Sequence, residues 1–181
     1  MASVLWLNEE GGADRCTLES GTAGFRLHGI ALLADDGAPV EARYAVDGDG
    51  FWRTRRADVV VAWPDRLVEL LLEADGVGGW TLDGRKLAAV EGCLDVDLAF
   101  TPATNTLPLR RMELEVGEAA EVECAWLRFP ELSVERALQR YERLAFDRYR
   151  FSSGSFSAEL GVDRNGLVLD YSGLWRSLAR T

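Results

Sequence analysis

The chain has 181 residues, of which 48% are hydrophobic and 28% charged, the balance of a globular protein, which excludes intrinsic disorder. This length predicts a single domain over residues 1–181, and the apolar runs are shorter than the ~20 residues of a membrane-spanning helix. Asp and Glu number 30 against 20 Lys and Arg, giving a net charge of −10 that repels nucleic-acid phosphates and anionic bilayers. We therefore expect no nucleic-acid partner and no stable membrane insertion.

The N-terminal segment lacks the pattern of a secretory signal. Such a signal needs positive charge followed by ~7–15 apolar residues, whereas MASVLWLNEEGG has no basic residue and reaches Glu9 and Glu10 early. The cysteines Cys16, Cys93 and Cys124 have no CxxC spacing, and the chain has a single histidine, so no zinc pattern is present. We expect a cytoplasmic protein with free thiols and no metal.

Asp-Gly and Asn-Gly pairs recur along the chain and mark tight turns. They are Asp36-Gly37, Asp47-Gly48, Asp49-Gly50, Asp75-Gly76, Asp83-Gly84 and Asn165-Gly166. Between them, apolar and polar residues alternate with the period of a β-strand, over residues 25–33, 40–46, 59–63, 68–72, 94–100, 122–126, 156–162 and 167–171. About a dozen short strands with turns between them predict an all-β fold built on a many-stranded antiparallel sheet.

Several of these strands are apolar on both faces. Ile30 and Leu32 oppose Leu27 and Leu33, and residues 67–72 show the same pattern. Either a second layer covers the outer face, or the sheet curls so that one apolar face lines a core and another lines a groove. A curled sheet with an apolar concavity would suit a lipid-binding protein.

The segment Val134–Ala145 has two interpretations. Ser133 can cap a helix whose apolar residues, among them Leu138 and Tyr141, recur at helical spacing. The same residues can also be extended, with Tyr141 as a typical strand residue. Periodicity alone favours one short helix here.

The densest polar cluster follows Cys93. Asp95 and Asp97 share one face of a strand, a polar loop follows, and residues 107–116 are expected to form the next strand. If the two strands form a hairpin, Asp97 lies opposite Arg110, and a bulge near Arg110 and Arg111 reconciles the apolar pattern. The cluster is then a structural salt-bridged hairpin, a polar rim that binds a ligand headgroup, or an acid–base pair of aspartates.

Catalytic patterns are otherwise absent from the sequence. His28 is the only histidine, no serine lies in a Gly-x-Ser-x-Gly elbow, and no glycine-rich loop precedes a helix. We therefore predict no catalytic residue, cofactor or bound metal. Two of the six tryptophans lie beside turns, where aromatic rings can cover a sugar or an acyl chain. With the polar cluster, they give the predicted ligand-binding residues Arg111, Arg110, Asp95, Asp97, Thr104, Asn105, Trp80 and Trp175.

Several motifs together resemble the "putative glycolipid-binding" family of bacterial proteins over nearly the whole chain. They are GCLDVD at 92–97, TPATNTLPLRR at 101–111, QRY at 139–141 and GLVLDYSGLW at 166–175. The resemblance implies a spiral β-roll similar in shape to periplasmic lipoprotein carriers, with a role in glycolipid binding or transport. It also implies that Val134–Ala145 is mostly extended, with at most one helical turn.

We therefore expect non-catalytic binding or transport of an amphipathic ligand, a lipid or glycolipid, in the curl of a β-roll with at most one short helix. A protein-interaction module that uses an exposed sheet face or edge, self-association into a homo-oligomer included, is the alternative. An enzyme acting on a lipid-like or sugar substrate through Asp95, Asp97 and Arg110 ranks third.

Overall fold

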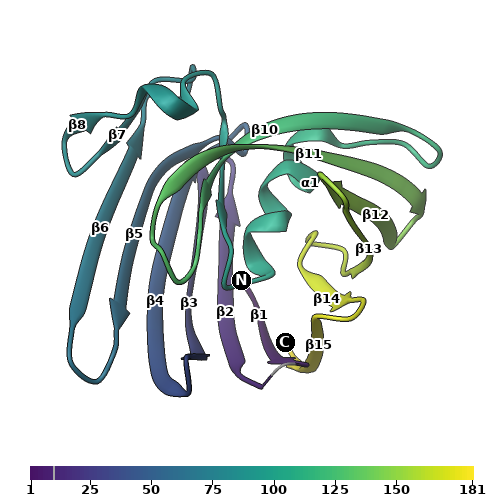
Figure 1. Ribbon diagram of the computed structural model, residues 1–181. Helices are drawn as coiled ribbons and strands as arrows, with labels where there is room; N and C mark the ends of the chain where they lie inside the picture. The colour runs from purple at the N-terminus through teal and green to yellow at the C-terminus, as the bar shows by residue number, and fades with distance from the viewer. Residues whose placement is uncertain (10) are drawn as a thin grey trace.

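Residues 1–9 and 11–181 are described by a computed structural model, in which β-strands make up most of the chain (Figure 1). The strands are β1 (Ala2–Asn8), β2 (Ala13–Gly21), β3 (Gly24–Asp35), β4 (Ala38–Asp49), β5 (Thr54–Ala62), β6 (Leu67–Ala74), β7 (Trp80–Leu82), β8 (Arg85–Lys86), β9 (Asp95–Leu98), β10 (Ala119–Leu127), β11 (Val134–Ala145), β12 (Arg148–Ser153), β13 (Phe156–Val162), β14 (Val168–Tyr171) and β15 (Trp175–Arg180). The helical elements of the described residues are the 3₁₀ turns η1 (Ala88–Val90) and η2 (Ala103–Asn105) and the helix α1 (Thr106–Met112).

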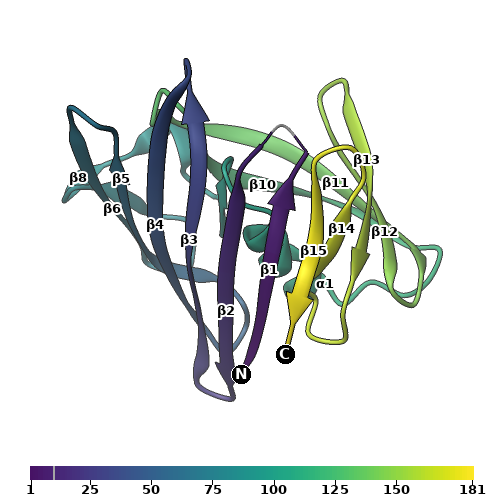
Figure 2. The ribbon, with the colours of Figure 1, turned by 90° about the horizontal axis from the view of Figure 1, so that it is seen from below.

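All 15 strands belong to one sheet, in the order β8-β7-β6-β5-β4-β3-β2-β1-β15-β14-β13-β12-β11-β10-β9. The first and last strands, β1 and β15, pair in the middle of this order, so the two ends of the chain lie side by side (Figure 2). The edges of the sheet are β8 and β9. The prediction of an antiparallel all-β sheet is confirmed, with one correction, because β9 pairs with β10 in parallel.

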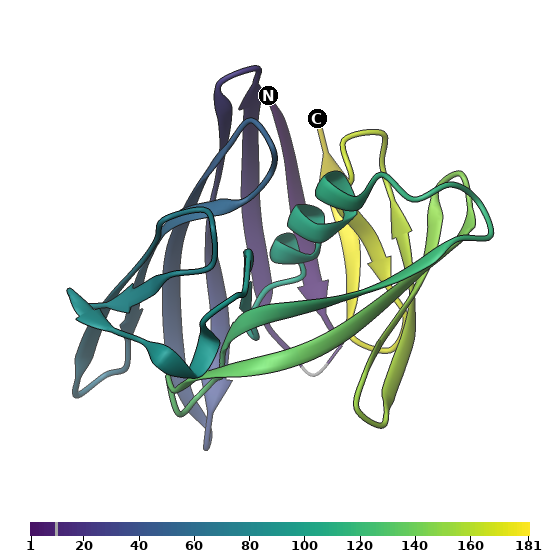
Figure 3. The ribbon, with the colours of Figure 1, turned by 90° about the horizontal axis from the view of Figure 1, so that it is seen from above.

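The sheet curls around α1, which lies between the N-terminal strands and β10–β11 (Figures 1 and 3). The edge strand β9 returns to the first half of the sheet at Thr54, the first residue of β5. The Thr54 amide donates to the Leu94 carbonyl at 2.9 Å, and the Val96 amide donates to the Thr54 hydroxyl at 3.1 Å. One edge is thereby held against the inside of the sheet without closing a barrel, which confirms the predicted spiral roll.

The core lies on the inner face of the curl. Alternating residues of β3, β4 and β5 point inward, among them Leu27, Ala42, Val46 and Val61, all fully buried. Trp6 of β1 is also fully buried and donates from Nε1 to the Val168 carbonyl at 2.8 Å, which joins β1 to β14. The three cysteines of the chain are buried free thiols.

The two-sided apolar strands expose their second face to solvent. Ile30, Leu32 and Leu67 are 45%, 53% and 60% exposed. No other part of the described chain covers them, so the expected second layer is absent there. The outer face does not line a groove either, because the concave side of the sheet is the side that holds the core.

The segment Val134–Ala145 is the continuous strand β11, so the helix that periodicity favoured is wrong and the extended reading is confirmed. It pairs with β10 from Val134 to Glu142 and with β12 over its second half. Gln139 and Tyr141 point inward and are buried, whereas Leu138, just before Gln139, is 53% exposed. Hydrogen bonding to two neighbours outweighs the weak helical pattern.

The strand predicted over residues 107–116 is wrong, because Thr106–Met112 forms α1. Pro108 lies in the first turn of this helix, where its missing amide proton is not needed, whereas in a central strand it would break the ladder. Leu107 and Leu109 are buried inside the curl. The predicted hairpin and its bulge are therefore absent. No helix in the described part of the chain is long and apolar enough to cross a membrane.

Candidate ligand-binding site

A pocket of about 290 Å³ opens on the inner face of the second half of the sheet, between β9–β11 and β12–β15. We call it the aromatic pocket. Its lining has an aromatic side and a polar side. The aromatic side consists of Trp126, Phe151, Phe156, Tyr171 and Trp175, and the polar side consists of Asp97, Asn105 and Gln139.

Asp97 is the centre of the polar side. One carboxylate oxygen accepts a hydrogen bond from the Thr104 hydroxyl at 3.1 Å, and the other accepts one from Nε2 of Gln139 at 2.6 Å. Desolvation by the surrounding protein raises the pKa of Asp97 above its ordinary value, although both hydrogen bonds act in the opposite direction. The carboxyl group is therefore held in a fixed orientation in a poorly hydrated site.

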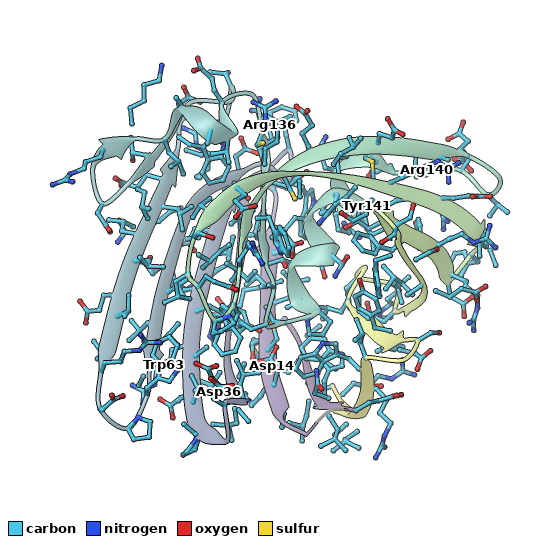
Figure 4. All side chains as sticks on the ribbon, in the orientation of Figure 1. Asp14, Asp36, Trp63, Arg136, Arg140 and Tyr141 are labelled. Atoms are coloured by element: carbon cyan, nitrogen blue, oxygen red, sulfur yellow. The ribbon has the colours of Figure 1, made fainter. Side chains whose placement is uncertain are left out.

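Tyr141, on β11, points into the curl (Figure 4). Its hydroxyl lies 2.9 Å from Oδ1 of Asn105 and 3.0 Å from Oε1 of Gln139. Both amides are fixed in orientation, because Nδ2 of Asn105 donates to the Pro102 carbonyl at 3.2 Å and Nε2 of Gln139 donates to Asp97. A tyrosine hydroxyl has one proton to donate. The Tyr141 hydroxyl can therefore donate to only one of the two amide oxygens at a time.

The aromatic side is a cluster of rings in contact. Phe151 and Phe156 lie 6.0 and 6.2 Å from Tyr171, measured between ring centroids. Phe156 is 42% exposed and lies at the mouth of the pocket, while Trp175 is buried. Such a surface can cover the apolar face of a sugar ring or a short length of alkyl chain.

The predicted pairing of Asp97 with Arg110 is wrong, because Arg111 pairs with Asp95 instead. Arg111 donates from Nε to Oδ1 of Asp95 at 3.2 Å and from Nη2 to Oδ2. The Asp95 side chain is only 1% exposed, and its burial raises its pKa although Arg111 acts to lower it. The pair connects the last turn of α1 to β9, and neither residue lines the aromatic pocket.

Arg110 lies on a different side of α1, since consecutive helical residues are about 100° apart. Its guanidinium stacks on Trp52, 4.8 Å from the ring centroid, and lines a separate cavity. Trp80, predicted at a ligand rim, is buried in the first half of the sheet, where its Nε1 donates to the Cys93 carbonyl at 2.8 Å.

The structure therefore brings together only part of the predicted ligand-binding set. Asp97, Asn105 and Trp175 line the aromatic pocket, and Thr104 supports Asp97 by its hydrogen bond. Sequence reasoning missed the other lining residues Gln139, Trp126, Phe151, Phe156 and Tyr171. Within residues 1–9 and 11–181, no three His, Cys, Asp or Glu side chains gather as a metal site requires.

Comparisons with known proteins agree with this fold. The sequence matches the family described as "Putative glycolipid-binding" over residues 3–177. The fold is similar to the crystal structure of a DUF1089 family protein from Pseudomonas aeruginosa, with a TM-score of 0.83 and 34% identity over 91% of this chain and 92% of that chain. No curated protein matches this chain. The chain therefore belongs to the family described as "Putative glycolipid-binding".

Proposed function

We propose that this protein binds an amphipathic ligand, a glycolipid, without catalysing its conversion, and that the aromatic pocket holds the sugar. The observation that carries the proposal is the combination of clustered aromatic rings with a fixed carboxyl group and two amide oxygens that share one tyrosine proton. Sugar hydroxyls supply the donors that such acceptors lack, and the apolar face of a sugar ring packs on aromatic side chains. The family description supports the same ligand class.

The charge of the pocket favours a neutral ligand. Asp97 is the charged side chain among the lining residues, which include no arginine or lysine. A phosphate or sulfate would therefore meet a carboxylate without a compensating cation. A neutral sugar avoids this repulsion and gains the hydrogen bonds.

The size of the pocket limits how much of the ligand it covers. Sites that enclose a small molecule measure about 300–1,000 Å³, and the aromatic pocket, at about 290 Å³, falls at the lower end. It accommodates one sugar ring or a short alkyl segment, so most of a two-chain lipid would remain outside.

A binding role without chemistry is favoured by the isolation of Asp97. Hydrolysis of a glycosidic bond uses two carboxyl groups on either side of that bond. The second aspartate of the strand, Asp95, is paired with Arg111 and does not line the pocket. The pocket therefore offers one carboxyl group rather than two.

Titration with octyl β-D-glucoside below its critical micelle concentration tests this proposal, with tryptophan fluorescence and calorimetry as readouts. We expect saturable binding that is tighter than binding of glucose or octanol alone. Asp97→Asn and Phe156→Ala should each weaken it about tenfold, the order expected for one charge-assisted hydrogen bond or for one partly exposed ring that the ligand covers. Phe146→Ala, which changes an exposed ring outside the pocket, is the matched control.

Absence of saturable octyl glucoside binding to the wild-type protein would exclude this function. Equal binding by Asp97→Asn and the wild type would place the ligand elsewhere.

An interaction module is the second candidate function, and the exposed apolar residues Ile30, Leu32 and Leu67 on the outer face favour it. This role predicts concentration-dependent association in sedimentation velocity that octyl glucoside does not reverse. Leu32→Lys should abolish the association while leaving the aromatic pocket intact. A monomer at all concentrations, with normal glucoside binding, would leave only the first function.

A further inference from the structure

A second cavity, of about 390 Å³, lies beside the C-terminal half of α1 and contains three arginine side chains. We call it the arginine pocket. It is formed between α1, the turn after β11 and the turn between β13 and β14, with Arg110, Arg143 and Arg164 as its cationic lining.

Arg110 is the least satisfied of these arginines. Its guanidinium packs on Trp52, and its Nε is buried without a hydrogen-bond partner. Among the described residues, none of its N–H groups donates a hydrogen bond and no carboxylate forms an ion pair with it. A buried donor without an acceptor is destabilising, and the charge of this guanidinium likewise has no anionic partner.

The other two cations are also without carboxylate partners. Arg143 donates to the backbone carbonyls of Leu114 at 2.6 Å and Phe146 at 2.9 Å, which orient its guanidinium but leave its charge uncompensated. Arg164 is exposed, and its side chain forms no ion pair with any residue that the structure describes. Many other arginines of this acidic chain are paired, as Arg111 is with Asp95.

Three carboxylates share the lining and balance the formal charge of the three arginines, but none of them is in ion-pair contact with an arginine. Glu113, Glu115 and Asp163 form no ion pair with Arg110, Arg143 or Arg164 within the described residues. The oxygens of Asp163 are engaged in its own turn, where Oδ1 accepts from the backbone amides of Asn165 and Leu167 at 2.8 and 2.9 Å and Oδ2 accepts from Nδ2 of Asn165 at 3.0 Å. The cationic groups therefore remain available to an external anion.

We propose that the arginine pocket binds an oxyanion of the phosphate class carried on an apolar group. Arginine presents a planar fork of N–H donors that matches a phosphate group, with charge-assisted hydrogen bonds of about twice the strength of neutral ones. The cavity is larger than an inorganic phosphate needs, and Leu109, Phe146, Tyr149 and Val162 also line it. These apolar side chains suit the carbon chain that carries the anion.

This second site is distinct from the aromatic pocket in residues and in charge, since the two linings share no residue. An anionic amphiphile and a neutral glycolipid would therefore bind to different parts of the protein. A result that excludes binding in one pocket does not bear on binding in the other, so the two proposals are tested independently.

Calorimetric titration of the full chain with octyl phosphate below its critical micelle concentration tests the arginine pocket. We expect saturable binding that weakens as salt is added, because screening reduces the attraction between arginine and phosphate. Arg110→Gln should weaken it about tenfold or more. Arg164→Gln, which changes an exposed side chain and so spares the fold, should also weaken it. Arg15→Gln is the matched control, an exposed arginine on β2 outside the cavity.

Inorganic phosphate and octyl glucoside separate the contributions of the anion and the chain. Tighter binding of octyl phosphate than of inorganic phosphate supports an anionic amphiphile as the ligand. Equal binding of both, still lost in Arg110→Gln, retains the oxyanion site but overturns the apolar part of the proposal. Wild-type protein that binds neither phosphate compound, or Arg110→Gln and Arg164→Gln proteins that bind like the wild type, would overturn it entirely.

Discussion

Replacing Arg111 with alanine should destabilise the fold by about 3–5 kcal/mol, the cost of leaving a buried charge without its partner. The Asp95 carboxylate is 1% exposed, and Arg111 binds both of its oxygens. Without the guanidinium, Asp95 would be ionised in a desolvated site between β9 and α1. Urea unfolding monitored by tryptophan fluorescence measures the loss as a lower free energy of unfolding.

The pH dependence of this loss follows from the direction of the Asp95 pKa. Burial already raises that pKa in the folded protein, so Asp95 favours folding at low pH and this contribution is lost as pH rises through the folded pKa. Removing Arg111 raises the pKa further. The destabilisation of Arg111→Ala should therefore be larger at about pH 8 than at about pH 5, where protonation relieves the unpaired charge.

Two further variants decide whether the Asp95 pair is the cause. Arg148→Ala breaks an exposed ion pair with Glu159, whose side chains are 48% and 42% exposed, and should cost about 0–1 kcal/mol. Asp95→Asn combined with Arg111→Ala should be more stable than Arg111→Ala alone, because no charge is left buried. An Arg111→Ala protein as stable as Arg148→Ala would show that the pair contributes little.

The sheet could be predicted from the sequence because short local residue pairs mark most of its turns. Five of the six Asp-Gly and Asn-Gly pairs mark where strands end, whereas Asp47-Gly48, expected at a turn, lies within β4. Period-two alternation indicates which residues point inward, as Val40, Ala42 and Val46 do. The short helix was missed because its seven residues are too few for a helical period to emerge. The shift of apolar phase between Leu109 and Met112, read as a bulge, together with Pro108, was the signal of a helical turn.

The candidate site was harder to predict because its contacts join distant segments. Gln139 reaches Asp97 across 42 residues of sequence, and Tyr141 reaches Asn105 across 36. The family resemblance included residues 139–141, but a single sequence does not indicate which side chain the buried Gln139 amide hydrogen-bonds. The same limit explains Asp95 and Arg111, since interpreting the helix α1 as a strand paired the wrong aspartate with the wrong arginine.

A second buried carboxyl group was not singled out by the sequence. Asp14, on β2, is fully buried, and its Oδ2 accepts hydrogen bonds from the hydroxyl groups of Tyr44 and Thr101 (Figure 4). Its Oδ1 has no hydrogen-bond partner among the described residues. Burial raises the pKa of Asp14 from 3.8 to about 7. Thr101 also lines the aromatic pocket, so a single hydrogen bond connects the Asp14 carboxyl group to a residue of the candidate site.

Asp14 should make the protein less stable as pH rises. A folded pKa above the ordinary value means that the folded state binds the proton more tightly, so its contribution to stability is present below about pH 4 and is lost as pH rises through about 7. A difference of about three pKa units corresponds to about 4 kcal/mol in the free energy of unfolding.

Asp14→Asn should remove this dependence, because asparagine does not ionise and can still accept from Tyr44 and Thr101. Urea unfolding at about pH 4 and about pH 8.5 should give a wild-type free energy that falls, relative to the variant, by up to about 4 kcal/mol between the two conditions. Asp36→Asn, at an exposed turn residue, should keep the wild-type slope. If Asp14→Asn kept that slope as well, the buried carboxyl group would have to be ionised in the fold at both pH values, and hydrogen bonds from two hydroxyl groups would suffice to hold a charge inside the sheet.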